Sequence, residues 1–82
     1  MTINFEQLFQ QALAEHLNNN LDEAERLYKK TLEIEPKHPD ANHNMGSLAL
    51  GAGKVEAALP FLKTALEVNP KIAHYWITYI CL

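Results

Sequence analysis

The side chains best suited to metal binding are four histidines, and their spacing decides whether they could share an ion. They are His16, His38, His43 and His74. No two of them stand at i and i+4 on one predicted helix, and no cysteine or carboxylate completes a known ligand spacing. We therefore predict no metal site, and we expect the histidines at the surface.

Carboxylate pairs could act as general acid and base, provided that burial raises the pKa of one member. The candidates lie at the two ends of one predicted helix: Asp22, Glu23, Glu25, Glu33 and Glu35. These positions fall on faces open to water, so nothing is expected to desolvate one carboxylate and leave its neighbour charged.

A nucleophile and a phosphate-binding loop also lack support. Cys81, the single cysteine, would need a positioned base to act as a nucleophile; a packed or exposed thiol is the alternative. The run Gly51-Ala52-Gly53 follows a predicted helix rather than a strand, and it lacks the further glycine of a phosphate loop. The sequence thus predicts no catalytic residue, no cofactor and no enzyme activity.

The bulk composition narrows the range of partners. The chain has 82 residues and a net charge of −3, with no basic run, so we expect no nucleic-acid binding. No apolar run approaches the roughly 18 residues that suggest a membrane span. The first residues, Met1 to Asn4, show neither the basic nor the apolar region of a signal peptide, and a cytoplasmic location is predicted.

The elements that would position these side chains follow from an internal repeat. Residues 22–36 return 34 positions later as residues 56–70 without a gap. Five residues recur unchanged: Ala24, Lys29, Leu32, Glu33 and Pro36 become Ala58, Lys63, Leu66, Glu67 and Pro70. A unit of this length is typical of a helical hairpin, so the repeat predicts an all-α fold of antiparallel helix pairs.

Five helices are predicted, over about 4–18, from 21 to before Pro36, from Pro39 to about 51, over 54–68 and from about 70 onward. Asn4 with Gln7, and Asn20 with Glu23, have the spacing of a capping box. Asn19 and Gly53 hold equivalent places in the two hairpins, where a tight turn needs a left-handed residue. The predicted inward residues of the two hairpins are Phe5, Leu8, Phe9, Ala12, Leu13, Leu17, Leu21, Ala24, Leu27, Tyr28, Thr31, Leu32, Ala41, Met45, Leu48, Ala49, Val55, Ala58, Leu59, Leu62, Ala65 and Leu66.

A small residue stands in the middle of the first helix of each hairpin, Ala12 in one and Gly46 in the other. Glycine costs about 1 kcal/mol against alanine in a helix, so a close approach of the partner helix is predicted at Gly46. Replacement of Gly46 by leucine is expected to cost about 1–3 kcal/mol or more through overpacking.

The last segment is apolar on several sides. Trp76, Tyr79 and Ile80 match one buried face, whereas Tyr75, Ile77 and Leu82 spread around the helix. Such a helix expects partners on more than one side. One hypothesis is self-association, or packing of a following helix, through Trp76, Ile77, Tyr79 and Ile80; the alternative is a helix folded back on its predecessor with some apolar area exposed.

At these residues the chain resembles the tetratricopeptide repeat family, with two full repeats and the start of a third. The second repeat carries the pattern as Met45-Gly46, Ala58, Leu62, Ala65 and Pro70, with Asn42 in place of the usual tryptophan and Ala49 in place of the tyrosine. The first repeat carries Ala12, Ala24, Tyr28, Thr31 and Pro36, and the third begins with Trp76. The resemblance implies one domain over residues 1–82, with repeats at 5–38, 39–72 and 73–82, stacked as a short right-handed solenoid.

The resemblance also implies a concave groove lined by the first helix of each repeat. The residues it places there are Glu6, Phe9, Gln10, Leu13, His16, Asp40, His43, Asn44, Ser47, His74, Ile77, Thr78 and Cys81. Asn44 matches an asparagine that often contacts a bound peptide backbone, and Gln10 and Thr78 hold the equivalent places. An amide both donates and accepts hydrogen bonds, although Asn44 could equally be an ordinary solvated helix residue. Of the five places that grip a carboxylate in chaperone-binding members (Phe9, Leu13, Asn44, His74 and Thr78), only Asn44 agrees, so no carboxylate clamp is expected.

The predicted function is a non-catalytic module that binds a peptide or a partner segment in this groove. Two alternatives stay open at this stage. The chain could be an N-terminal accessory segment of a larger bacterial glycosyl-, sulfo- or methyltransferase, since similar repeats precede such domains. It could also be a structural unit that assembles with copies of itself through its last helix.

Overall fold

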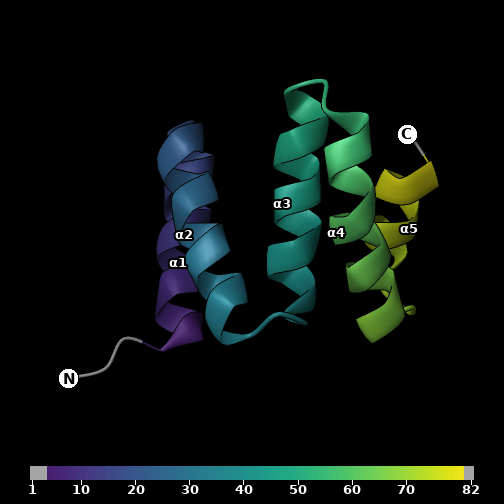
Figure 1. Ribbon diagram of the computed structural model, residues 1–82, viewed down its shortest axis with the longest axis horizontal. Helices are drawn as coiled ribbons and strands as arrows, with labels where there is room; N and C mark the ends of the chain where they lie inside the picture. The colour runs from purple at the N-terminus through teal and green to yellow at the C-terminus, as the bar shows by residue number, and fades with distance from the viewer. Residues whose placement is uncertain (1–3, 81–82) are drawn as a thin grey trace. The chain divides into compact units, whose positions relative to one another are not determined.

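The computed structural model describes residues 4–80, except for the side chain of His74. Its helices are α1 (Phe5–Leu17), α2 (Leu21–Ile34), α3 (Pro39–Gly51), α4 (Val55–Val68) and α5 (Ala73–Ile80), and no strand occurs within residues 4–80 (Figure 1). The predicted all-α class is confirmed, and α1 with α2, and α3 with α4, pack as helix pairs.

The chain divides into two compact units, with the boundary between Pro36 and Lys37. Unit 1 contains α1 and α2, and unit 2 contains α3, α4 and α5. Within unit 2, α5 packs against α4. The stacking of all the repeats in one right-handed solenoid stays a prediction.

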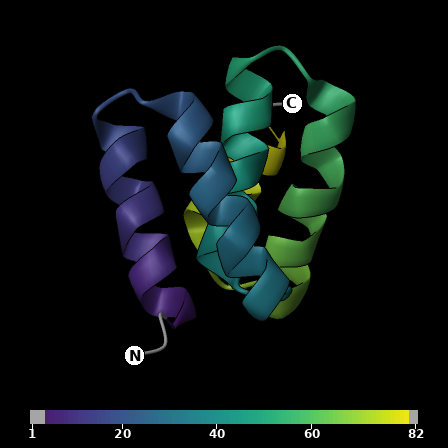
Figure 2. The same cartoon turned by 60° about the vertical axis from the view of Figure 1, so that its left-hand side comes forward.

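A tight turn joins the two helices of each hairpin (Figure 2), and the two turns have the same backbone geometry. Asn19 has φ 63° and Gly53 has φ 76°, so both lie in the left-handed region, as predicted. The backbone N–H of Asn20 donates to the carbonyl of Glu15, and that of Lys54 donates to the carbonyl of Ala49, each at 2.8 Å. The two bonds differ by 34 positions at both ends, so the sequence period is also a period of hydrogen bonding.

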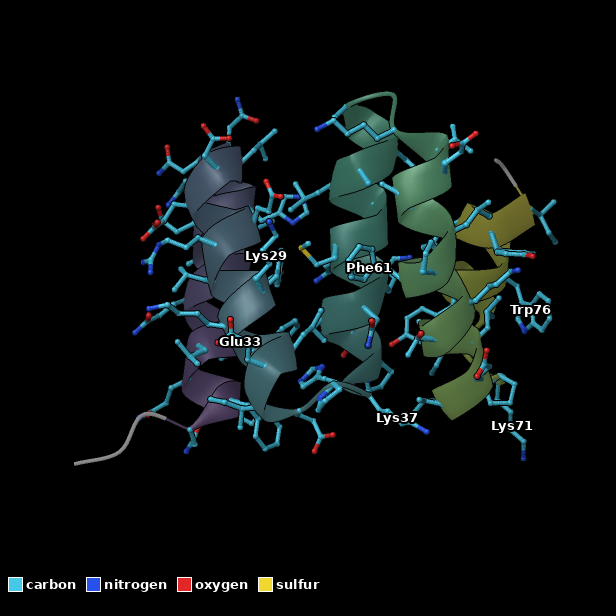
Figure 3. The ribbon with its side chains drawn as sticks, in the orientation of Figure 1. Lys29, Glu33, Lys37, Phe61, Lys71 and Trp76 are labelled. Carbon is cyan, nitrogen blue, oxygen red and sulfur yellow. The ribbon has the colours of Figure 1, made fainter. Side chains whose placement is uncertain are left out.

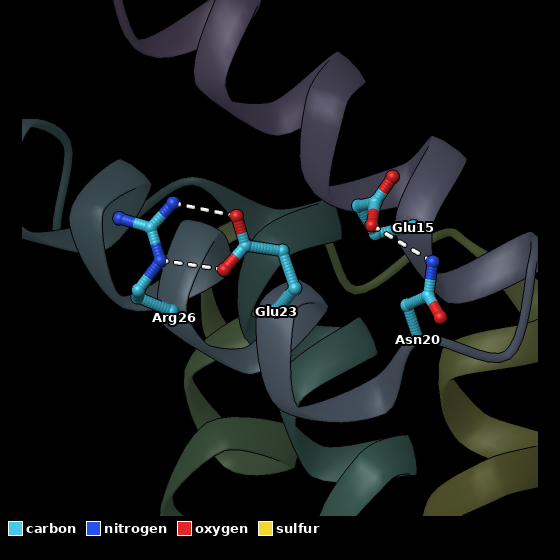
Figure 4. A network of polar contacts seen from close by, with 4 residues as sticks. All are labelled: Glu15, Asn20, Glu23 and Arg26. Carbon is cyan, nitrogen blue, oxygen red and sulfur yellow. Dashed lines mark hydrogen bonds and ion pairs between the residues drawn. The ribbon is translucent and has the colours of Figure 1, made fainter.

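The predicted capping boxes have opposite outcomes. At α1 the box forms, because the Asn4 side chain accepts from the Gln7 N–H at 2.9 Å and the Gln7 side chain accepts from the Asn4 N–H at 3.3 Å. At α2 the prediction is wrong, since Asn20 makes no side-chain cap and instead donates from Nδ2 to Glu15 Oε2 at 3.0 Å (Figure 4).

Glu23 shows why the second box fails. Both of its carboxylate oxygens accept from the Arg26 guanidinium at 2.6 Å (Figure 4). These hydrogen bonds lower the pKa of Glu23 below its usual value. A two-point charged contact with Arg26 is favoured over one bond to a backbone N–H.

The expected surface position is wrong for His38. Pro39 begins α3, as predicted, and the residue before it is the N-cap. His38 is buried there, and its Nδ1 accepts from the Ala41 N–H at 3.1 Å. The imidazole thus satisfies a helix donor, a role usually taken by the short side chains of Ser, Thr, Asp or Asn.

The core of unit 1 is centred on Tyr28, which has no exposed surface. Its hydroxyl lies 3.0 Å from His16 Nδ1, and its ring centroid lies 6.0 Å from that of Phe9. The other buried residues of the unit are Leu8, Ala12, Ala24, Leu27 and Thr31, all of which were predicted to face inward.

Three residues beside the tight turns are exposed, contrary to prediction. Leu17 is 79% exposed, Leu21 44% and Val55 43%. Leu21 and Val55 are each the first residue of the second helix in a hairpin and stand 34 positions apart. At a hairpin end the helices have no further turn to pack against, so helical spacing alone overstates burial there.

In unit 2 the close approach at Gly46 is confirmed. A Cβ added there would lie 2.5 Å from Leu62 Cδ2 and 2.7 Å from Leu62 Cγ. Leu62 itself is only 1% exposed, so it fills the space over the glycine. The further core residues of α3 and α4 are Ala41, Met45, Ala58, Ala65 and Leu66.

The predicted buried face of the last helix is wrong in its rotation. Tyr75 is the buried residue, at 2% exposed, and it packs with Ala65 and Leu66 while Ile72 and Tyr79 cover the cluster. Trp76 is 44% exposed and Ile80 is 75% exposed, and the Trp76 side chain projects outward from α5 (Figure 3). The indole N–H donates to the carbonyl of Pro70 at 2.6 Å, which ties Trp76 to the connection before α5. The prediction for Leu82 lies outside the described residues.

Candidate functional site

Two first helices of the repeat pattern, α3 and α5, are joined by side-chain contacts in unit 2. Tyr75 donates its hydroxyl hydrogen to Asp40 Oδ1, and Thr78 Oγ1 lies 2.9 Å from His43 Nε2. Both pairs span 35 residues. The second pair lies three residues, about one helical turn, further along both helices. Because the sequence separation stays the same, α3 and α5 run parallel to each other at this contact.

Aromatic stacking strengthens this junction. The His43 and Tyr75 rings stack with centroids 4.9 Å apart and planes inclined by 24°. The other ring nitrogen of His43, Nδ1, lies 3.3 Å from Asn44 Oδ1. His43 therefore touches one residue of its own helix and two residues of α5. These contacts limit the rotamers that the four side chains can adopt.

The phenol of Tyr75 stays neutral over the ordinary pH range. Burial, together with the hydrogen bond to Asp40 and the charge of that carboxylate, raises the pKa of Tyr75 above its usual value. A neutral phenol donates one hydrogen bond to Asp40 but leaves its negative charge in place.

One face of α3 and α5 carries the predicted groove residues of unit 2. We call it the α3/α5 face and define it by Asp40, His43, Asn44, Ser47, Ile77 and Thr78. Positions i, i+3, i+4 and i+7 share one side of a helix, which brings the four residues of α3 together. Thr78 adjoins them through its contact with His43.

The exposure of this face is mixed. Asn44, Ser47 and Thr78 are half-buried, Asp40 is exposed, and Ile77 is 60% exposed. Hydroxyl and amide groups thus occur on the same two helices as an open aliphatic side chain on α5. This combination can hydrogen-bond an extended backbone and bury one apolar side chain.

The remaining groove predictions have different outcomes. On α1, Gln10 is exposed and Leu13 is half-buried, and their membership of a common groove with α3 stays a prediction. Phe9 is only 7% exposed because its ring packs toward Tyr28, so it contributes mainly to the core of unit 1. Cys81 and the side chain of His74 lie outside what the structure describes.

The family resemblance predicts His43 as a groove residue but does not predict its partners on α5. Tyr75 is the main omission, since its phenol anchors α5 to the start of α3. A signal was present: Asp40 and Tyr75, like His43 and Thr78, stand one repeat plus one residue apart. Polar and aromatic pairs at that offset are candidates for contacts between successive first helices.

Neither a metal-binding cluster nor a membrane-spanning helix occurs among the described residues, 4–80. Among the side chains that the structure describes, no group of three or more His, Cys, Asp or Glu gathers in an arrangement that could hold a metal ion. Within the same range, no helix has the length and apolar character needed to cross a bilayer.

Comparison with known families decides the membership of the chain. A family model described as the tetratricopeptide repeat matches residues 15–77. The chain belongs to the tetratricopeptide repeat family. Repeats of this family generally mediate protein–protein interaction and are typically non-catalytic. No curated protein sequence matches the chain.

Proposed function

We propose that this tetratricopeptide repeat protein binds an extended segment of a partner protein along the α3/α5 face. The observation that carries the proposal is the His43 junction, where one imidazole contacts Asn44 on α3 and both Tyr75 and Thr78 on α5. These contacts hold polar groups from two parallel helices in fixed positions. Preorganised groups bind with a smaller loss of side-chain entropy.

The chemistry of the face suits an extended backbone. A peptide backbone offers alternating donors and acceptors, and the amide of Asn44 and the hydroxyls of Ser47 and Thr78 can supply both roles. Ile77 adds an exposed apolar contact next to Thr78. Hydrogen bonds would position the segment, and burial of an apolar side chain against Ile77 would add affinity.

Selection from a random peptide display library on the intact chain, followed by fluorescence polarisation with the selected peptides, tests this function. Asn44→Ala is expected to weaken binding about tenfold, the effect of roughly one hydrogen bond to a partner. Gln11→Ala is the matched control, because Gln11 is an exposed amide side chain on α1 outside the predicted groove. Equal affinities of the two variants, or the absence of any selected peptide, would refute the proposal.

The exposed residues of α5 favour self-association as a second candidate function. Trp76, Ile77 and Ile80 present apolar surface, whereas Tyr79 is partly buried against the Tyr75 cluster and has less to offer. Burial of each large apolar side chain contributes about 1.5–3 kcal/mol, enough to drive association of two copies. Sedimentation equilibrium tests this candidate: a dimer that Ile80→Lys dissociates supports it, and a monomer at millimolar concentration excludes it.

No contact among residues 4–80 favours the alternative role as an accessory segment of a transferase, which stays a prediction.

A further inference from the structure

We propose that the partner segment bound by the α3/α5 face is positively charged, carrying a lysine or arginine side chain that meets Asp40. This inference rests on the proposed function and adds to it the chemical class of the partner. It follows from the distribution of charge over the helices and from the surroundings of one carboxylate.

The first helices of the repeats contain no positive residue other than histidine. The ranges of α1, α3 and α5 hold neither lysine nor arginine, although the chain has seven such residues. All seven lie on second helices or in connections: Arg26, Lys29, Lys30, Lys37, Lys54, Lys63 and Lys71. Figure 3 shows three of them: Lys29 on α2, Lys37 before α3 and Lys71 before α5.

Acidic residues, by contrast, do occur on the first helices. Glu6 and Asp40 stand 34 positions apart, in the first turns of α1 and α3. Each of the first two repeats therefore has a carboxylate at the same place on its first helix. Both side chains are exposed, so a ligand can reach them. The inference needs only the carboxylate of unit 2.

Asp40 is held in position without being neutralised. The hydroxyl of Tyr75 donates to its Oδ1, and this phenol stays uncharged. Glu23 forms an ion pair with Arg26 and Glu25 forms one with Lys29, and Asp40 belongs to neither of these two pairs. Lys37, three residues before Asp40, is exposed and forms neither of these pairs.

A fixed, exposed negative charge favours one class of ligand. A lysine or arginine that reaches Asp40 gains a charge-assisted hydrogen bond, whereas an acidic side chain meets a like charge. The same argument disfavours a ligand anchored by its C-terminal carboxylate, because α3 and α5 offer no lysine or arginine to receive it. Charge thus selects among the peptides that Asn44 and Ile77 could accommodate.

The test uses the peptide selection described above, performed on the intact chain at about pH 8. Selected peptides are expected to be enriched in lysine and arginine and depleted of aspartate and glutamate. The lysine of the best peptide is then replaced by glutamine and by glutamate. Affinity is expected to fall about two- to fivefold for glutamine and further for glutamate, with a smaller difference at high salt.

Matched variants of the protein locate the effect. Asp40→Asn keeps an oxygen that can accept from Tyr75 but removes the charge, and it is expected to abolish the preference for lysine over glutamine. Glu67→Gln makes the same charge change on an exposed residue of α4 and should preserve the preference. Each result that follows these expectations supports the inference.

Failures of the two proposals are distinguishable. If selected peptides are neutral or acidic yet still depend on Asn44, the function stands and the inference of a cationic segment is overturned. A lysine preference that survives Asp40→Asn also overturns it. If no peptide is selected at all, the proposed function fails, and the inference fails with it.

Discussion

Replacing Gly46 by alanine probes the closest helix contact of unit 2. The added Cβ would lie 2.5 and 2.7 Å from two atoms of Leu62, about 1 Å less than an ordinary carbon–carbon contact of roughly 3.5–4.0 Å. Leu62 is 1% exposed and cannot move its side chain into solvent. The backbone carbonyl of Ala58, at 3.4 Å, does not obstruct the change.

Two opposing effects determine the expected free energy. Overpacking costs about 1–3 kcal/mol, and exchange of glycine for alanine in a helix gains about 1 kcal/mol. The net result for Gly46→Ala is a loss of about 0–2 kcal/mol. Gly51→Ala is the control, because it lies in the same helix with nothing within 4 Å of the new Cβ; it should stabilise unit 2 by up to about 1 kcal/mol.

Truncation of the neighbour should reverse the sign of the effect. Leu62→Ala removes both clashing atoms and itself costs about 2–5 kcal/mol. In that background Gly46→Ala is expected to stabilise by about 1 kcal/mol, so the coupling energy of the two changes is about 1–3 kcal/mol.

Urea unfolding followed by tryptophan fluorescence measures the cycle. Trp76 is the single tryptophan of the chain and lies in unit 2, so the signal reports this unit. An osmolyte such as trimethylamine N-oxide can bring the weaker variants into range. The reasoning is refuted if Gly46→Ala stabilises the wild type as much as Gly51→Ala does, or if its effect is the same in both backgrounds.

Three further changes have defined outcomes. Tyr28→Phe removes the buried hydroxyl that meets His16 and should cost about 0.5–1.5 kcal/mol in urea unfolding; no loss would show the bond to be unimportant. Asn19→Gly relieves a positive φ and should stabilise unit 1 by a few tenths of a kcal/mol or more, whereas a loss would contradict the turn geometry. Because folding raises the pKa of Tyr75, its neutral form stabilises unit 2 fully below the unfolded value of about 10, and this stabilisation is lost as pH rises toward the folded pKa. Urea unfolding between pH 8 and 11 should therefore show a steeper decline for the wild type than for Tyr75→Phe, and identical slopes would count against the role of the phenol.

The sequence by itself determined the features that depend on residues close together along the chain. The repeat of residues 22–36 at 56–70 predicted the helix pairs, and the places of Asn19 and Gly53 predicted the left-handed turns, because a tight turn admits few residue types. Gly46 predicted a close helix contact for a similar reason: a residue that costs helix stability must be compensated by packing.

The tertiary structure decided features that result from competition between partners. Glu23 could cap α2 or bind Arg26, and both choices fit the spacing of the sequence. His38 could be exposed or cap α3, and only the burial at that helix end selects the cap.

The candidate site shows the same division. Helical spacing placed His43, Asn44 and Thr78 on first helices, but it could not state how far α5 is turned about its axis. A rotation by one residue, about 100°, exchanges Tyr75 for Trp76 in the buried position, and both residues are aromatic. Only the third dimension distinguishes them, because Tyr75 alone lies where its hydroxyl reaches Asp40 while its ring stacks on His43 and packs with Ala65 and Leu66.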